Sequence, residues 1–183
     1  MAQPSRLGNK RPGENSLKLH YRMVDNFLIR RALVTEQEEL EGLQLRASLT
    51  NAGDRDALLA HPDAIELPAR QIAAGGVFVA EWKGAIVGFT AVEPRADGES
   101  ELDALFVDPN MRRRGIGRLL IEHCAELART RGSGSLCVVG NRHAEEFYTA
   151  CGFTVIGTAE TRFGSALLMR RMVGPGSGGL GNP

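Results

Sequence analysis

The segment LFVDPNMRRRGIGRLL at residues 105–120 joins an apolar run, a turn and a glycine-rich start of a helix. The apolar run ends at Val107, and Asp108 followed by Pro109 favours a turn. Apolar residues at helical spacing begin at Ile116, so the segment predicts a strand, a sharp turn and a helix in that order.

Three consecutive arginines, Arg112, Arg113 and Arg114, precede this predicted helix. The first turn of a helix has unpaired N–H groups and roughly half a positive charge, so sequences usually place acidic residues there. Unless the arginines are only a solvated surface cluster, cations at this end call for an anion. Gly115 and Gly117 leave room for a phosphate to approach the backbone. The turn therefore predicts a phosphate or pyrophosphate site.

Two common phosphate-binding patterns do not fit this turn. A P-loop needs GxxxxGK followed by Ser or Thr, a pattern that the sequence lacks. A dinucleotide-binding turn needs GxGxxG, but Leu120 stands where the third glycine is required. The P-loop is therefore excluded, and Rossmann-type binding is disfavoured.

The rest of the chain predicts an α/β fold with a mixed, mostly antiparallel central sheet and flanking helices. We expect strands at residues 27–34, 77–81, 85–92, 102–107, 136–139, 153–158 and 166–172. We expect helices that begin at a capping box of Thr35 and Glu38, at Pro68, at Ile116 and at Asn141. Because residues 136–139 are continuously apolar and follow the long helix, they predict a parallel strand-helix-strand crossover.

Composition predicts one domain between two flexible ends. Residues 1–26 are polar and interrupted by Pro and Gly, and residues 174–183 are rich in Gly, Pro and Ser. We therefore expect a flexible N-terminal extension at 1–26 and a flexible tail at 174–183. The domain at 27–173 contains no internal repeat.

Charge and cysteine content limit which partners and which cellular compartment we expect for this protein. Lys plus Arg and Asp plus Glu both total 22, so no overall charge favours nucleic acid. The three cysteines lack a CxxC spacing and the four histidines are scattered, which predicts reduced cysteines and no metal site. The chain has no apolar run as long as a signal peptide or a membrane span. We therefore expect a cytoplasmic protein without a membrane partner.

The segment RRRGIG at 112–117 resembles the Gln/Arg-x-x-Gly-x-Gly/Ala signature of the GCN5-related N-acetyltransferase (GNAT) family. The resemblance continues through LFVDP at 105–109, NRHAEEFY at 141–148 and CGF at 151–153. It covers residues 27–173 and is strong only from Leu102 onward. It implies a GNAT fold, in which two neighbouring parallel strands splay apart and acetyl-CoA lies between them.

The resemblance also implies which residues bind acetyl-CoA or another acyl-CoA. The pyrophosphate would lie on the turn, and the pantetheine arm would lie against the strand before it. These residues are Phe106, Val107, Arg112, Arg113, Arg114, Gly115, Ile116, Gly117, Arg118 and Asn141. Asn141 is equally an ordinary N-cap, and both interpretations stay open.

Tyr148 occupies the position where many GNAT members hold a tyrosine that donates a proton to the departing CoA thiolate. A phenol with an ordinary pKa of about 10 is neutral at pH 7 and can donate that proton. Packing in the core is the alternative role for this residue. As the base for the amine, Glu101 ranks ahead of Asp103. The alternative for both is a plain solvent-facing residue, and this alternative is favoured for Asp103. A water relay also stays open.

These features predict an enzyme that transfers an acetyl group from acetyl-CoA to a primary amine, directly and within a ternary complex. The alternative is a non-catalytic acyl-CoA sensor or partner-binding module of the same fold, motivated by the unassigned base. A nucleic-acid binder has less support, because no aromatic residues alternate with the arginines. The identity of the amine, the length of the acyl group and the formation of a homodimer stay open. We expect residues 49–76 to select the amine.

Overall fold

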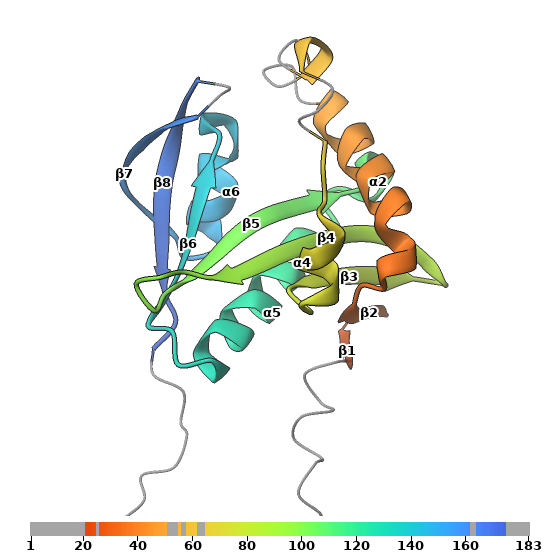
Figure 1. Ribbon diagram of the computed structural model, residues 1–183, viewed down its shortest axis with the longest axis horizontal. Helices are drawn as coiled ribbons and strands as arrows, with labels where there is room; N and C mark the ends of the chain where they lie inside the picture. The colour runs from red at the N-terminus through yellow and green to blue at the C-terminus, as the bar shows by residue number, and fades with distance from the viewer. Residues whose placement is uncertain are drawn as a thin grey trace, which may run out of the picture.

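The described part of the chain forms one mixed sheet of eight strands in this computed structural model (Figure 1). The structure describes residues 21–24, 26–50, 55, 58–61, 65–161 and 164–174. In their order across the sheet, the strands are β1 (Tyr21–Val24), β2 (Phe27–Arg31), β3 (Val77–Trp82), β4 (Ala85–Pro94), β5 (Ser100–Val107), β6 (Ser135–Gly140), β8 (Gly164–Met172) and β7 (Thr154–Thr161). Neighbouring strands are antiparallel except β5 and β6, which are parallel.

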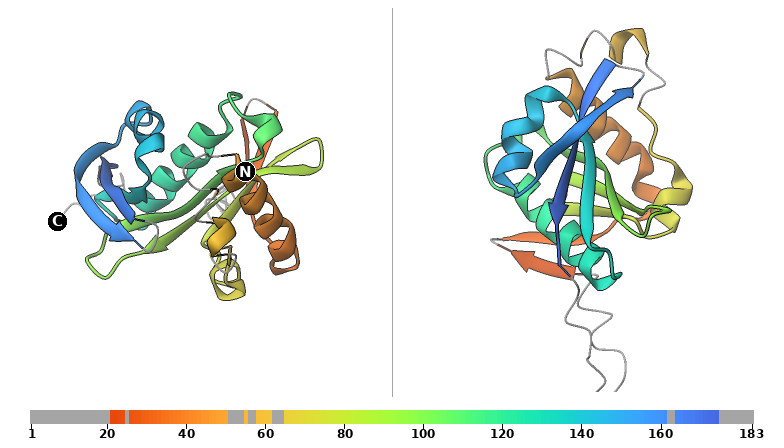
Figure 2. Two further views of the ribbon diagram at one scale, coloured as in Figure 1. Left: turned by 90° about the horizontal axis from the view of Figure 1, so that it is seen from above. Right: turned by 90° about the vertical axis from the view of Figure 1, so that its left-hand side faces the viewer.

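Helices cover both faces of this sheet (Figures 1 and 2). They are η1 (Val34–Glu36), α2 (Gln37–Leu49), α4 (Ala69–Ala73), η3 (Pro109–Met111), α5 (Ile116–Thr130), η4 (Arg142–Ala144) and α6 (Glu145–Ala150). Helix α5 buries Leu120 and Ile121 in a core on one face of the sheet. Helix α2 buries Leu40 and Leu43 in a second core on the other face. Full burial of each such side chain stabilises the fold by roughly 1.5–3 kcal/mol.

The parallel strands β5 and β6 are paired at one end and separate at the other. Their pairing runs only from Ser100 opposite Leu136 to Leu102 opposite Val138, although β5 continues to Val107. The Glu99 carboxylate pins the paired end, because it accepts hydrogen bonds from the Ser135 backbone N–H at 2.5 Å and from the Ser135 hydroxyl at 2.6 Å. The sheet therefore opens into a V along the second half of β5 (Figure 1).

An irregularity in β5 changes which side chains face each core. Val92 of β4 pairs with Leu102, but the residue before it, Ala91, pairs with Ala104. Asp103 is therefore an extra residue in β5. Such a β-bulge bends the strand and redirects side chains. Leu102 belongs to the core beneath α5, whereas Ala104 packs against the core beneath α2.

The predicted fold class is confirmed, including the antiparallel strands at 77–107, the parallel crossover and the splayed pair. The predicted capping box of Thr35 and Glu38 is wrong. A 3₁₀ turn precedes α2, and Glu36 accepts the hydrogen bond from the Leu33 N–H at 2.8 Å. Glu36 also pairs with Arg30 at 2.7 Å, which fixes this carboxylate at the entrance to the helix.

The ends of the chain differ from the prediction in one described segment. Strand β1 lies inside the predicted extension at 1–26 and pairs with β2, so the sheet begins at Tyr21 rather than at Phe27. Residues 1–20 and 175–183 lie outside the described residues. None of the helices in the described ranges has both the length and the apolar character that a membrane span needs.

Candidate functional site

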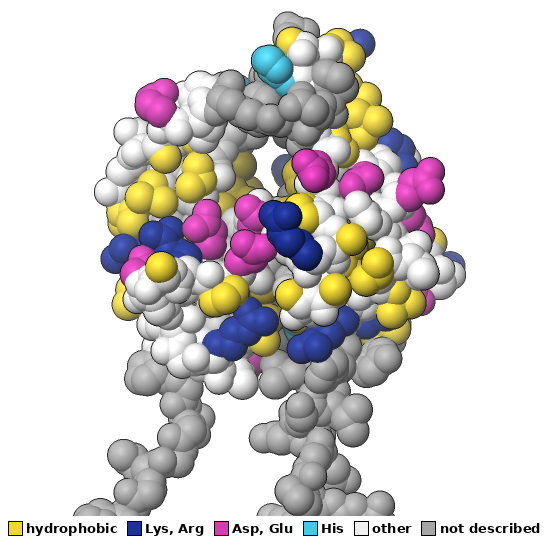
Figure 3. All heavy atoms as spheres, in the orientation of Figure 1, with side chains coloured by type: hydrophobic (Ala, Val, Ile, Leu, Met, Phe, Trp, Pro, Cys, Tyr) yellow, Lys and Arg dark blue, Asp and Glu magenta, His cyan; other side chains and the backbone are white. Residues whose placement is uncertain are grey.

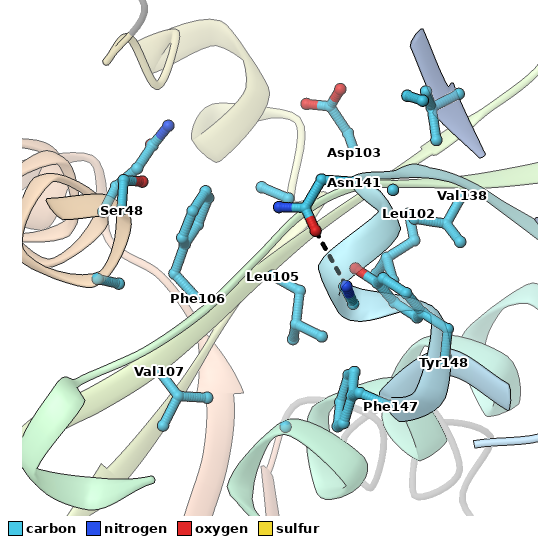
Figure 4. A pocket seen from close by; sticks show the side chains of 18 of the residues that line it. Ser48, Leu102, Asp103, Leu105, Phe106, Val107, Val138, Asn141, Phe147 and Tyr148 are labelled. Atoms are coloured by element: carbon cyan, nitrogen blue, oxygen red, sulfur yellow. Dashed lines mark hydrogen bonds between the residues drawn. The ribbon is translucent and has the colours of Figure 1, made fainter. Parts of the chain in front are cut away.

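A cleft of about 1000 Å³ opens where β5 and β6 separate (Figure 4). Ser48 of α2 lines one side, and Phe147 and Tyr148 of α6 line the other. The start of α5 contributes to the cleft at the Val107 end of β5, and Glu101 and Asp103 contribute near the paired end. One cleft thus joins a helix N-terminus to two carboxylates.

The start of α5 is shaped to receive an anion. Its N-cap, Gly115, has a φ of +79°, which favours glycine, and a Cβ there would meet no atom within 4 Å. At Gly117 a Cβ would lie 3.0 Å from the Phe147 ring, so a larger residue would displace that ring. The first turn of α5, which the structure describes in full, has no acidic residue. Its N–H groups and partial positive charge are therefore available to a ligand in the cleft.

The arginines beside this turn have separate positions. Arg113 lines the cleft, with its backbone at a φ of +63°. Arg112 also lines it, but its guanidinium donates to the Ala47 carbonyl at 3.2 Å and to the Thr50 hydroxyl at the end of α2. The Arg114 guanidinium lies 5.9 Å from the centre of the Trp82 ring, on the β3–β4 hairpin.

Two more of the predicted acetyl-CoA-binding residues line the cleft and also form hydrogen bonds that stabilise the fold. Arg118 lines the cleft and donates to the Ala150 carbonyl at 2.8 Å, which stabilises the last turn of α6. Asn141 also lines the cleft, and its Oδ1 accepts a hydrogen bond from the Ala144 N–H at 3.0 Å. The capping interpretation of Asn141 is therefore correct for its side-chain oxygen.

Tyr148 is held within the wall of the cleft. Its ring is 8% exposed and packs edge-on against Phe147 at 5.3 Å and Phe153 at 5.5 Å between ring centres. A Cβ at Gly140 would lie 3.0 Å from the ring, so this glycine permits its close approach to β6. Burial raises the pKa of the Tyr148 phenol above its ordinary range, so the phenol is protonated at neutral pH. Tyr148 is thus a core residue that also lines the cleft (Figure 4).

The two carboxylates near the paired end have different partners. Glu101 forms an ion pair with Arg95 at 3.2 Å and is partly exposed. Asp103 accepts a hydrogen bond at 2.9 Å from the Gln71 side-chain amide of α4. Asp103 is exposed, in agreement with the solvent-facing interpretation, and this hydrogen bond additionally anchors its carboxylate to α4.

Sequence reasoning missed two residues near the carboxylates, Gln71 and Arg95. Gln71 is 6% exposed, which is unusual for a glutamine on a five-residue helix, but its spacing from Asp103 carries no motif. Arg95 lies in the β4–β5 turn, where a charged residue is ordinary. Within the segment at 49–76 that we expect to select the amine, residues 51–54, 56–57 and 62–64 lie outside the described residues.

The model of a family described as "Acetyltransferase (GNAT) family" matches residues 46–153. The chain belongs to this family. The match includes α5, the turn before it, and the splayed strands, so the GNAT resemblance drawn from RRRGIG is confirmed.

Curated relatives of this GNAT chain include two N-acetyltransferases. An uncharacterised N-acetyltransferase of Methanocaldococcus jannaschii is 39% identical over 89 residues, which are 43% of this chain and 38% of that protein. The peptidyl-lysine N-acetyltransferase YjaB of Salmonella typhimurium is 42% identical over 59 residues, which are 32% of this chain and 39% of that protein. The chain thus spans about two fifths of the length of the curated relatives it matches.

Solved GNAT structures share the fold over most of both chains. Ard1 from Thermoplasma volcanium has a TM-score of 0.63 at 21% identity, covering 80% of this chain and 97% of that one. The N-acetyltransferase PaiA from Thermoplasma acidophilum, solved in complex with coenzyme A, has a TM-score of 0.65 at 17% identity and covers 80% and 98%. At these identities the likeness establishes the fold alone.

The residues of the cleft fit the coenzyme A that such a fold implies. The open space beside Gly115 and the start of α5 suit a pyrophosphate, and the gap between β5 and β6 suits a narrow, uncharged arm. Among the residues that the structure describes, no group of three His, Cys, Asp or Glu side chains is arranged to hold a metal ion.

Proposed function

We propose that this GNAT protein transfers an acetyl group from acetyl-CoA to a primary amine, directly and within a ternary complex. The observation that carries the proposal is that one cleft contains both the α5 N-terminus and the carboxylates of Glu101 and Asp103. A thioester donor with a diphosphate can therefore lie at one end while an amine approaches from the other. Because both reactants are held together, no covalent enzyme intermediate is needed.

The donor is held mainly by backbone groups and arginines of the turn. The N–H groups at residues 115–118 would bind the pyrophosphate, with Arg113 as an additional cation that lines the cleft. Phe106 and Val107 of β5 would lie along the pantetheine arm, and Asn141 would border it from the β6 side. Arg114, beside Trp82, is set back from this site.

Protons are moved by Glu101 and Tyr148 in this mechanism. Glu101 accepts a proton from the ammonium group, so that a neutral amine can attack the thioester carbonyl of acetyl-CoA. Backbone N–H groups of β5 beyond its last pair with β6 would lie along the thioester and would stabilise the negative oxygen. Tyr148 donates a hydrogen bond to the departing sulfur. As the C–S bond breaks, Tyr148 transfers this proton to the sulfur, which forms the CoA thiol, and the phenolate regains a proton from solvent. The raised pKa keeps the phenol protonated until that step.

The names of the relatives support an aliphatic amine as the acceptor, since YjaB is called a peptidyl-lysine N-acetyltransferase. The sensor alternative was motivated by the unassigned base. Two carboxylates in the cleft supply candidates for that role, so no observation now favours the sensor.

The test is release of free CoA thiol when the full chain is mixed with acetyl-CoA and a panel of primary amines. The proposal expects thiol release that depends on the amine and yields the matching N-acetyl product by mass spectrometry. Thiol release no faster with any amine than in buffer alone would contradict the proposal. In that case, retained binding of acetyl-CoA would favour the sensor.

A further inference from the structure

The amine end of the cleft opens into a second hollow that is rich in carboxylates. This hollow, of about 500 Å³, is lined by residues 93–97 of β4 and the turn after it, and it shares Glu101 and Asp103 with the main cleft. Its charged residues are Glu93, Arg95, Asp97, Glu101 and Asp103, so four carboxylates face one guanidinium. Figure 3 shows Asp and Glu side chains gathered beside the central hollow of the molecule.

The single cation in this set is already engaged by two of the carboxylates. Arg95 donates to Asp97 at 3.0 Å and to Glu101 at 3.2 Å. Asp103 is different, because the partner of its carboxylate is a neutral amide rather than a cation. Its negative charge is therefore the one at the junction of the two hollows that no described guanidinium offsets.

The amide that holds Asp103 is buried and only half satisfied. Gln71 is 6% exposed, and its Nε2 donates to Asp103 Oδ2 at 2.9 Å. Its Oε1 has no hydrogen-bond partner among the described residues. An unpaired buried amide oxygen is destabilising, so an apolar side chain at this position would stabilise the core more. The amide instead anchors the Asp103 carboxylate to α4.

We propose that Asp103, positioned by Gln71, binds a second positive charge on the acceptor. The acceptor is then a primary amine that carries another cationic group along the same flexible chain. Glu101 receives the reacting ammonium, and Asp103 binds the second one at the junction with the outer hollow. This inference rests on the proposed acetyl transfer and narrows its substrate class.

Two sources share this chemistry, namely a free linear oligoamine and a lysine side chain next to another basic residue in a peptide. Both present a primary ammonium group with a second cation on a flexible chain near it. The experiment therefore uses two matched pairs. One pair is 1,4-diaminobutane against n-butylamine, and the other is a lysine peptide with a neighbouring arginine against the same peptide with citrulline.

The measured quantity is the ratio of kcat/KM within each pair, from CoA thiol release. A hydrogen-bonded charge is worth roughly 1.5–3 kcal/mol, so the dication should be preferred by about tenfold or more in at least one pair. The pair that shows the preference identifies the source. Added salt should reduce the ratio, because the second contact is electrostatic and partly exposed.

Variants assign the preference to these residues. In Asp103→Asn the ratio should fall to within about twofold of one, and Gln71→Leu should lower it by a smaller factor with the loss mainly in KM. Because a ratio cancels the folded fraction, a destabilised variant still gives a valid result. Glu39→Gln, which removes an exposed carboxylate on α2, should leave the ratio unchanged.

Two outcomes would overturn the inference: a wild-type ratio near one in both pairs, or a preference that persists in Asp103→Asn. Both are distinct from failure of the proposed function itself. If the proposed function fails, no amine of any charge will release thiol. If only this inference fails, n-butylamine will still be acetylated by the wild-type protein.

Discussion

The two ends of the cleft are built in different ways. The donor end comes from one continuous segment, in which β5, the turn at Asp108 and the start of α5 follow each other, and much of it acts through backbone groups. The amine end is assembled from α4, the β4–β5 turn and β5, and its central hydrogen bond joins residues 32 positions apart. A continuous backbone site leaves a motif in the sequence, whereas a side-chain site assembled by the fold does not.

The largest effect is expected at Tyr148, which belongs to the donor end. Tyr148→Phe keeps the ring contacts with Phe147 and Phe153 but removes the hydroxyl, so kcat should fall by about 100-fold. The Kd of acetyl-CoA should stay within about twofold, because the phenol acts on the departing sulfur. Steady-state thiol release and calorimetric binding measure the two quantities, and an unchanged kcat would remove Tyr148 from the mechanism.

A smaller effect is expected from the glycines that bracket α5. Gly115 and Gly132 have φ values of +79° and +83°, and a Cβ at either would meet nothing within 4 Å. Replacing either with Ala should cost about 1–2 kcal/mol of stability, because both positions have a left-handed backbone conformation that strains a residue with a Cβ.

Of the two variants, only Gly115→Ala should also raise the Kd of acetyl-CoA, by about tenfold, because Gly115 borders the cleft and Gly132 does not. Thermal unfolding without ligand and titration with acetyl-CoA separate the two effects. Equal loss of affinity in Gly132→Ala would mean that helix stability, rather than the anion site, sets the affinity.

The smallest effect is expected from Arg112, which connects the two ends. Its bonds to Ala47 and Thr50 hold the last turn of α2, so Arg112→Gln should lower stability by about 1 kcal/mol and raise the KM of the amine severalfold. Arg113→Gln, on the adjacent residue, should instead raise the Kd of acetyl-CoA. If both variants change the same constant, the two ends are not separable in this way.

Much of the fold could be predicted from the sequence because its signals are local. The apolar spacing from Ile116 and the run at 136–139 predicted α5 and the parallel strand after it, and both are confirmed. The start of α2 was misplaced because Glu36 bonds both Arg30 and the Leu33 N–H, and the partner from β2 is set by the tertiary structure. Strand β1 was missed because it has only four residues and lies in a segment that is polar and interrupted by Pro and Gly.

The site was predictable only in part, for a related reason. Gly115 and Gly117 contribute to the site because they have no side chain, and a glycine is visible directly in the sequence. Asp103 acquires its direction from a bulge, which depends on pairing with β4, and its partner Gln71 lies on another helix. Arg114 looked equivalent to its two neighbours in sequence, but its side chain lies beside Trp82.

The central claim is that the turn before α5 binds acetyl-CoA, and thermal unfolding with matched anions tests it most directly. At a hundredfold excess over Kd, a ligand of the native state adds about 2.7 kcal/mol, which should raise Tm by roughly 5 to 10 °C. The account predicts this rise with acetyl-CoA and little with ATP or NAD. No rise, or an equal rise with all three, would contradict it.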